Sequence, residues 1–149
     1  MRFALRWIAA ALLAAPLLAL AAVSPAHAQQ SVGLDWMIGK WCMDNGTCLD
    51  IHKRADGAVI TDWKASDGRT SQGVITMEEG RAVLTTQNIR AAEELSRGPN
   101  EIVLKHTGGK ARTSSELDHL RYSRDGDSLT LEFTFGDGET QAAVYRRAQ

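Results

Sequence analysis

Three histidines that follow residue 28, His52, His106 and His119, are the side chains best suited to acid–base or metal chemistry. Their positions match no recognised ligand spacing, so the sequence predicts no metal site. Asp50 lies two residues before His52, which on a strand places both side chains on one face, where a carboxylate can orient an imidazole. The two residues form either a catalytic pair or part of a polar outer surface, and we interpret them as surface.

Hydrolytic or nucleotide chemistry has little support in the sequence. Catalytic serines usually lie in a Gly-x-Ser-x-Gly context, which is absent, and Ser114 and Ser115 lie in a polar stretch with no neighbouring base. Gly108-Gly109-Lys110 is too short for a phosphate-binding loop. An enzyme is therefore the least favoured of the functions considered, and no catalytic residue is predicted.

The first 28 residues have the three parts of a secretory signal peptide: Arg2 and Arg6, an apolar run from Trp7 to Val23, and Ala26-His27-Ala28. We predict cleavage after Ala28 and a periplasmic or secreted product, with no stable membrane insertion afterwards. Removing 28 of the 149 residues leaves 121, which we expect to form one domain, 29–149. The 17 basic residues fall to 15 against 18 acidic ones, which argues against nucleic acid as a partner.

Cys42 and Cys48 are the two cysteines of the chain, and an oxidising compartment favours a disulfide between them. Asn45-Gly46 between them is a strong turn signal. A three-residue loop with Gly46 in the left-handed conformation would place Met43 opposite Thr47 and Cys42 directly opposite Cys48, whereas a two-residue turn would place Cys42 opposite Leu49. The cysteines thus favour the first register, in a closely spaced pair that suits a disulfide.

Short segments with alternating apolar and polar residues recur after residue 28, separated by Gly, Asn and Asp. Alternation with a period of two is typical of half-buried strands, and the spacing of the turns favours an antiparallel barrel or sandwich. The nine predicted strands are Gly39–Met43, Cys48–Lys53, Ala58–Lys64, Gln72–Glu78, Ala82–Gln87, Ile102–His106, Leu117–Ser123, Leu129–Phe135 and Thr140–Arg147. The segment Asn88–Gly98 is predicted as either a short helix near 89–97, with Asn88 and Gly98 as its caps, or a long loop.

The opening Trp36-Met37-Ile38-Gly39-Lys40-Trp41 resembles the Gly-x-Trp start of the calycins, the lipocalin and fatty-acid-binding-protein superfamily. It is closest to small exported bacterial domains of unknown function that begin with Trp-[Leu/Met]-x-Gly-x-Trp, and Tyr122–Thr130 is similar to their penultimate hairpin. The resemblance implies an all-β, antiparallel, lipocalin-like barrel of about eight or nine strands. It also implies a barrel-closing pair of Trp41 and a last-strand arginine, for which we select Arg146.

A barrel of this kind leads us to expect binding of a small, partly apolar ligand without catalysis. The candidate binding residues are Trp63, His106, Leu131 and Phe133. The alternative is a periplasmic protein-interaction or enzyme-inhibitor module, with a protruding loop at Thr107–Ser115 and a filled interior. Less favoured are a haem-binding barrel, with His106 or His119 as axial ligand, and a hydrolytic barrel. The cofactor is unknown, and none is expected.

Overall fold

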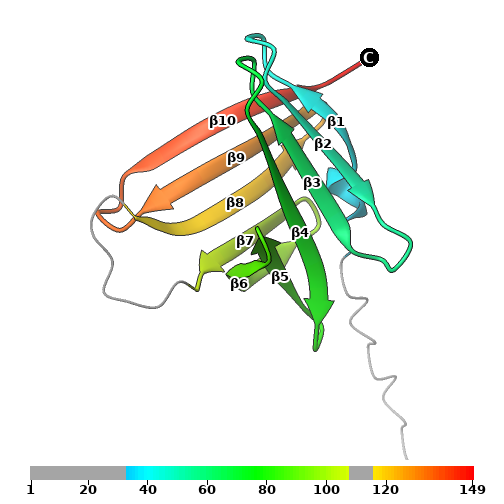
Figure 1. Cartoon of the computed structure of the whole chain (residues 1–149). Coiled ribbons are helices and arrows are strands. Elements are labelled where there is room, and N and C mark those ends of the chain that lie inside the picture. Colours follow the sequence, from blue (N-terminus) through cyan, green and yellow to red (C-terminus); the bar gives the residue numbers. More distant parts are fainter. Residues whose placement is uncertain (1–32, 108–115) are drawn as a thin grey trace, which may run out of the picture.

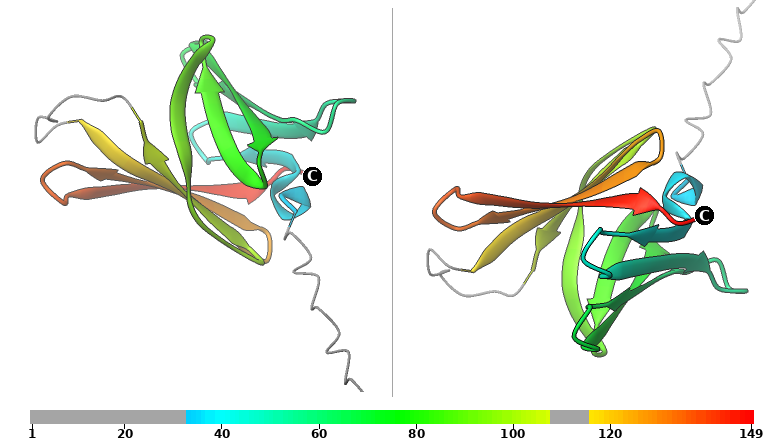
Figure 2. Two further views of the ribbon diagram at one scale, coloured as in Figure 1. Left: turned by 90° about the horizontal axis from the view of Figure 1, so that it is seen from below. Right: turned by 90° about the horizontal axis from the view of Figure 1, so that it is seen from above.

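Ten antiparallel strands close into one barrel in the order β1-β10-β9-β8-β7-β6-β5-β4-β3-β2 (Figure 1). The computed structural model describes residues 33–107 and 116–149. The predicted signal peptide, 1–28, therefore lies outside the described residues, as does nearly all of the Thr107–Ser115 loop. Every strand pairs with its neighbours in the chain, and β1 closes the barrel against β10. Figure 2 shows the two walls that result, one built from β2 to β5 and the other from β8 to β10.

A short 3-10 helix precedes the barrel, and the strands follow without interruption by any α-helix in the described ranges. The elements are η1 (Asp35–Met37), β1 (Gly39–Cys42), β2 (Cys48–Lys53), β3 (Val59–Lys64), β4 (Thr70–Glu78), β5 (Arg81–Thr86), β6 (Ile89–Gly98), β7 (Glu101–His106), β8 (Leu117–Asp125), β9 (Ser128–Phe135) and β10 (Thr140–Arg147). Within the described part of the chain, no helix is long and apolar enough to span a membrane.

The prediction of an all-β antiparallel barrel is confirmed, but the strand count is ten rather than eight or nine. The additional strand is β6, where the sequence predicted a short helix or a long loop. Gln87 and Asn88 both have positive φ, of 50° and 60°, so Asn88 belongs to a tight two-residue hairpin turn and does not cap a helix. The remaining differences are shifts of a few residues at strand ends, such as β4 beginning at Thr70 instead of Gln72.

Strand β6 carries two irregularities in its pairing, one opposite Leu84/Thr85 of β5 and one between Glu94 and Ser96 against β7. Each bulge adds an unpaired residue and reverses the phase of the side chains that follow. Leu95, which the second bulge leaves without a cross-strand partner, lies 60% exposed. This interruption explains why a search for strict alternation does not find the strand.

The pairing of β5 with β6 ends at Val83, and the side chain of Glu94 continues the connection. Oε2 of Glu94 accepts a hydrogen bond of 2.7 Å from the backbone N–H of Ala82, and Oε1 lies 3.3 Å from the guanidinium of Arg97. The side chains of Glu94 and Arg97 are 12% and 11% exposed. A nearly buried carboxylate thus takes the place of a missing backbone acceptor, which a sequence pattern cannot reveal.

We expect Glu94→Ala to lower the free energy of unfolding by about 2 kcal/mol, because it leaves the buried N–H of Ala82 without its acceptor and the nearly buried guanidinium of Arg97 without its carboxylate partner. The neighbouring Glu93 pairs with Arg90 at 2.8 Å, in a more exposed position. Glu93→Ala is therefore the matched control, with an expected loss of no more than about 1 kcal/mol. Denaturant unfolding of the two variants measures the difference, and equal losses would show that the Glu94 carboxylate does not support the β5–β6 seam.

The hairpin between β1 and β2 has the register that the cysteines predicted. Cys42 is paired directly with Cys48, their Cα atoms are 4.1 Å apart, and their sulfur atoms are at disulfide distance, 2.08 Å. The N–H of Met43 donates to the carbonyl of Thr47 over 2.8 Å, and Gly46 has φ of 85°. A three-residue loop with a left-handed glycine therefore places the cysteines in the non-hydrogen-bonded type of pair, where side chains approach most closely.

Candidate functional site

One half of the barrel is filled by side chains, and the other half is hollow. The largest fully buried side chains are Trp41, Met37, Ile51, Ile75, Ile102, Leu104 and Leu129, and all but Leu104 lie outside the walls of the cavity. The cavity has a volume of about 420 Å³ and is reached from the end where half-buried residues such as Trp63 and Phe133 lie. We call it the barrel pocket. Its walls are Leu49, Thr61, Trp63, Ser71, Gly73, Leu84, Thr86, Ala91, Ala92, Leu104, His106, Leu117, Leu120, Tyr122, Leu131, Phe133 and Tyr145.

The structure brings the four residues predicted from the sequence together on this pocket. Trp63 comes from β3, His106 from β7, and Leu131 and Phe133 from β9. Each has the inward phase of its strand, since Leu104 and Leu129, two residues away from His106 and Leu131, are fully buried. Alternation alone was sufficient to place these side chains on the inner face.

Three buried hydroxyl groups on the pocket wall were not predicted: Thr61 on β3, Tyr122 on β8 and Tyr145 on β10, which are 5%, 4% and 3% exposed. Burial raises the pKa of Tyr122 to about 12, with a further increase from the nearby Tyr145 phenol and an opposing effect from a hydrogen bond with Thr61. The sequence signal was available, because Tyr122 and Tyr145 lie two residues after the apolar, inward Leu120 and Ala143.

Gly73 on β4 leaves the space in which the Thr61 hydroxyl lies. A Cβ atom at this position would lie 2.6 Å from Thr61 Oγ1 and 3.0 Å from a methyl group of Leu84, both closer than side chains tolerate. The Thr61 hydroxyl in turn donates to the Gly73 carbonyl over 3.3 Å. The close approach of β3 and β4 therefore positions one of the polar groups on an otherwise apolar wall.

The closed end is sealed by Trp41, whose ring has no exposed surface. The guanidinium of Arg147 lies 4.4 Å from the ring centroid and that of Arg124 lies 5.5 Å from it. The selection of Arg146 for this role is wrong, because Arg147 is the cross-strand partner of Trp41, whereas Arg146 is paired with Cys42 and shares the outward phase of the half-exposed Val144. Arg124 was not predicted at all.

Gly39 completes this end and explains the spacing of the Gly-x-Trp opening. It has φ of +142°, which few other residues adopt, and a Cβ atom there would lie 2.7 Å from Nη1 of Arg147. The indole N–H of Trp41 donates to the Met37 carbonyl over 2.9 Å, which holds the ring against η1. Glycine at this position thus gives the arginine access to the face of the indole.

The other histidines lie away from the barrel pocket. His52 Nδ1 is 3.8 Å from Oδ2 of Asp62 on β3, and both side chains are about half-exposed, so His52 pairs across the strands on the outer surface. His119 Nδ1 lies 2.5 Å from the carboxylate of Asp118. Across residues 33–107 and 116–149, no group of three or more metal-ligating side chains is close enough to hold a metal ion.

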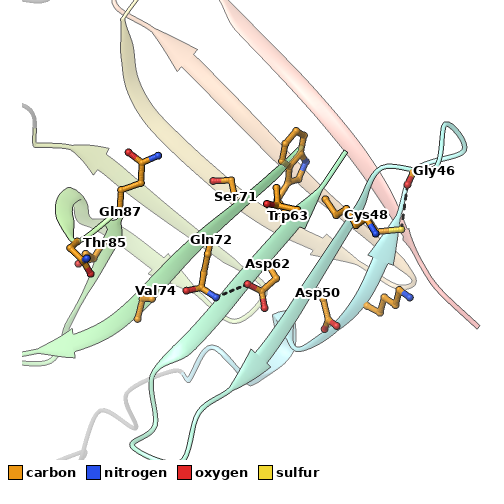
Figure 3. A pocket seen from close by; sticks show the side chains of 14 residues that line it. Gly46, Cys48, Asp50, Asp62, Trp63, Ser71, Gln72, Val74, Thr85 and Gln87 are labelled. Carbon is orange, nitrogen blue, oxygen red and sulfur yellow. Dashed lines mark hydrogen bonds between the residues drawn. The ribbon is translucent and has the colours of Figure 1, made fainter. Parts of the chain in front are cut away.

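A second hollow of about 950 Å³ lies along β1 to β5 (Figure 3), and it shares Trp63 and Ser71 with the barrel pocket. Its lining is mostly exposed and polar, and Gln72 Nε2 donates to Asp62 Oδ1 over 2.8 Å within it. Cross-strand pairing also places Lys40 beside Asp50 and Asp50 beside Asp62. Charges of both signs that neighbour one another in water are typical of a solvated sheet face, so we take the barrel pocket as the candidate site.

No protein-family model matches the chain, and no curated protein or solved structure was found to match it. The class of protein therefore follows from the architecture alone. It is an all-β, antiparallel, closed barrel, compatible with a calycin-like fold, with a side-chain plug at one end and a pocket open at the other.

Proposed function

We propose that this protein is an exported, calycin-like barrel that binds a small, partly apolar molecule in the barrel pocket. The observation that carries the proposal is the pocket itself, about 420 Å³ of space with largely apolar walls and a few hydroxyl groups. Sites for small molecules have this combination of size and lining. The disulfide-distance pair of Cys42 and Cys48 supports export to an oxidising compartment.

The alternative function, a protein-interaction or inhibitor module, requires a barrel filled by side chains. Only the half next to Trp41 is filled, while Trp63 and Phe133 border open space at the other end. The polar side-chain groups of the described pocket wall are hydroxyl groups, the imidazole of His106 and the indole of Trp63. Such a wall suits recognition of a bound molecule, which favours ligand binding over both the interaction module and a hydrolytic barrel.

Native mass spectrometry of the protein, purified from cells that export it, tests the proposal directly. We expect a fraction of the protein to carry an additional small mass that is released on denaturation, and the released compound can then be identified. Recovery of the bare polypeptide mass alone after gentle preparation would count against ligand binding of ordinary affinity.

A variant that fills the pocket should lose this ligand. Ala92 is 4% exposed, lines the pocket, and pairs with Leu84 and His106 on the neighbouring strands. We expect Ala92→Phe to reduce the ligand-bound fraction, or the affinity for the identified ligand, by about tenfold or more, because the ring occupies the binding space.

Ala142→Phe, on the exposed outer face of β10, is the matched control and should keep full binding. Thermal melting of both variants verifies that the barrel is intact. If Ala92→Phe folds and still binds as the control does, the ligand does not lie in the barrel pocket.

A further inference from the structure

The barrel pocket has no charged wall among the described residues. The described side chains that line it include no Lys, Arg, Asp or Glu, and its titratable groups are His106, Tyr122 and Tyr145. A carboxylate or phosphate buried against these side chains meets no lysine or arginine, and an unpaired buried charge is strongly unfavourable. The part of the wall that residues 33–107 and 116–149 provide is therefore unfavourable for anionic and cationic ligand groups alike.

Two arginines share the inner face of the barrel, but both lie beyond the tyrosines as seen from the pocket. Arg124 lies two residues after Tyr122 on β8, and Arg147 lies two residues after Tyr145 on β10. Each arginine therefore has the same phase as its tyrosine and lies nearer the closed end. Neither arginine lines the pocket. Both instead lie over the faces of Trp41.

Hydrogen bonds keep these guanidinium groups at the closed end. Arg124 donates to the carbonyls of Trp36 and Gly126, each over 2.8 Å, and Arg147 donates to the carbonyl of Ile38 over 3.5 Å. A guanidinium group that is held at the closed end by these hydrogen bonds cannot form an ion pair with a ligand in the barrel pocket. The pocket thus differs from a site in which a buried arginine receives an acid group.

The inner end of the pocket presents neutral hydrogen-bonding groups instead. Tyr122, Tyr145 and Thr61 are each at least nine-tenths buried and line the cavity. A phenol that remains protonated donates a hydrogen bond well to a neutral oxygen, and an unmatched buried hydroxyl discriminates against a ligand that lacks a partner for it. The apolar walls above, including Leu131 and Phe133, suit a hydrocarbon or aromatic body.

We infer that the barrel pocket selects an uncharged ligand, whose apolar body lies between the walls and whose alcohol, carbonyl or ester oxygen meets the buried phenol groups of Tyr122 and Tyr145. This inference rests on the proposed function and names the chemical class of its ligand. It excludes, as preferred ligands, molecules whose apolar body carries a carboxylic acid or a phosphate ester.

The test compares probes that share one carbon skeleton but carry either a neutral or an anionic polar group: decanol with decanoate, and naphthylmethanol with naphthoate, titrated in neutral buffer by calorimetry. We expect each alcohol to bind at least about tenfold more tightly than its acid. Equal or tighter binding of the acids would overturn the inference while leaving the proposed function in place. Failure of all four probes to bind the protein would contradict the proposed function, and the inference with it.

Removal of single hydroxyl groups separates hydrogen bonding from a general effect on structure. We expect Tyr145→Phe and Tyr122→Phe each to weaken naphthylmethanol binding by about three- to tenfold, the effect of one hydrogen bond, while binding of the parent hydrocarbon naphthalene stays unchanged. Loss of both ligands to the same degree would show that the tyrosines shape the pocket only. Unchanged binding of naphthylmethanol in both variants would show that its oxygen does not reach them.

Discussion

Replacing Trp41 by alanine is expected to lower the free energy of unfolding by about 3–5 kcal/mol, the range measured for loss of a large aromatic side chain from a core. The ring has no exposed surface and fills the closed end against η1. Its removal also leaves the guanidinium groups of Arg124 and Arg147 without the aromatic face, an interaction of about 0.5–2 kcal/mol for each. Denaturant unfolding measures the loss. The dependence of the unfolding free energy on denaturant concentration should be the same in both proteins if each unfolds in two states.

Trp41→Phe is the informative control for this prediction. Phenylalanine retains an aromatic face for the arginines but lacks the N–H that donates to the Met37 carbonyl over 2.9 Å. We therefore expect it to lose less than half of what alanine loses. A loss of under about 1 kcal/mol for Trp41→Ala would mean that the closed end is not a stabilising plug, and that the Gly-x-Trp opening has another role.

The strands and the pocket walls could be predicted from the sequence to a large extent, because alternation reports the inner face wherever pairing is regular. Leu129 to Phe135 alternates without a break and forms β9 with Leu131 on the pocket. The Cys42–Cys48 hairpin was predictable to the residue because two constraints, the cysteine pair and the Asn-Gly turn, agree on one register. Local patterns succeed where each residue has a regular partner.

The features that were missed depend on irregular pairing or on a choice between two phases. Strand β6 was not predicted because two bulges interrupt its alternation, and because Asn88 and Gly98 at its ends are also suitable helix caps. In β10, the sequences Ala142-x-Val144-x-Arg146 and Ala143-x-Tyr145-x-Arg147 are equally plausible inner faces. A shift of one residue reverses every side chain, and only the pairing of Arg147 with Trp41 decides the phase.

Alkaline pH is expected to destabilise the barrel through Tyr122. Burial raises the pKa of this phenol from 10.0 to about 12 in the folded protein, so the folded state holds its proton more tightly than the unfolded chain does. The contribution to stability is therefore complete below pH 10, decreases as the pH rises from 10 to about 12, and is absent above that. A difference of this size corresponds to about 3 kcal/mol of unfolding free energy.

Comparison with Tyr122→Phe isolates this contribution, because other groups that titrate at high pH are shared by both proteins. The unfolding free energy of the natural chain minus that of Tyr122→Phe should be constant up to about pH 10. Above that pH it should decrease by about 3 kcal/mol. Tyr122 and Tyr145 are the two tyrosines of the sequence, so tyrosinate absorbance in Tyr145→Phe follows Tyr122 alone. Titration of that phenol at its ordinary value would show that water reaches it, and the inner end of the pocket would then be wet and open to charged ligands.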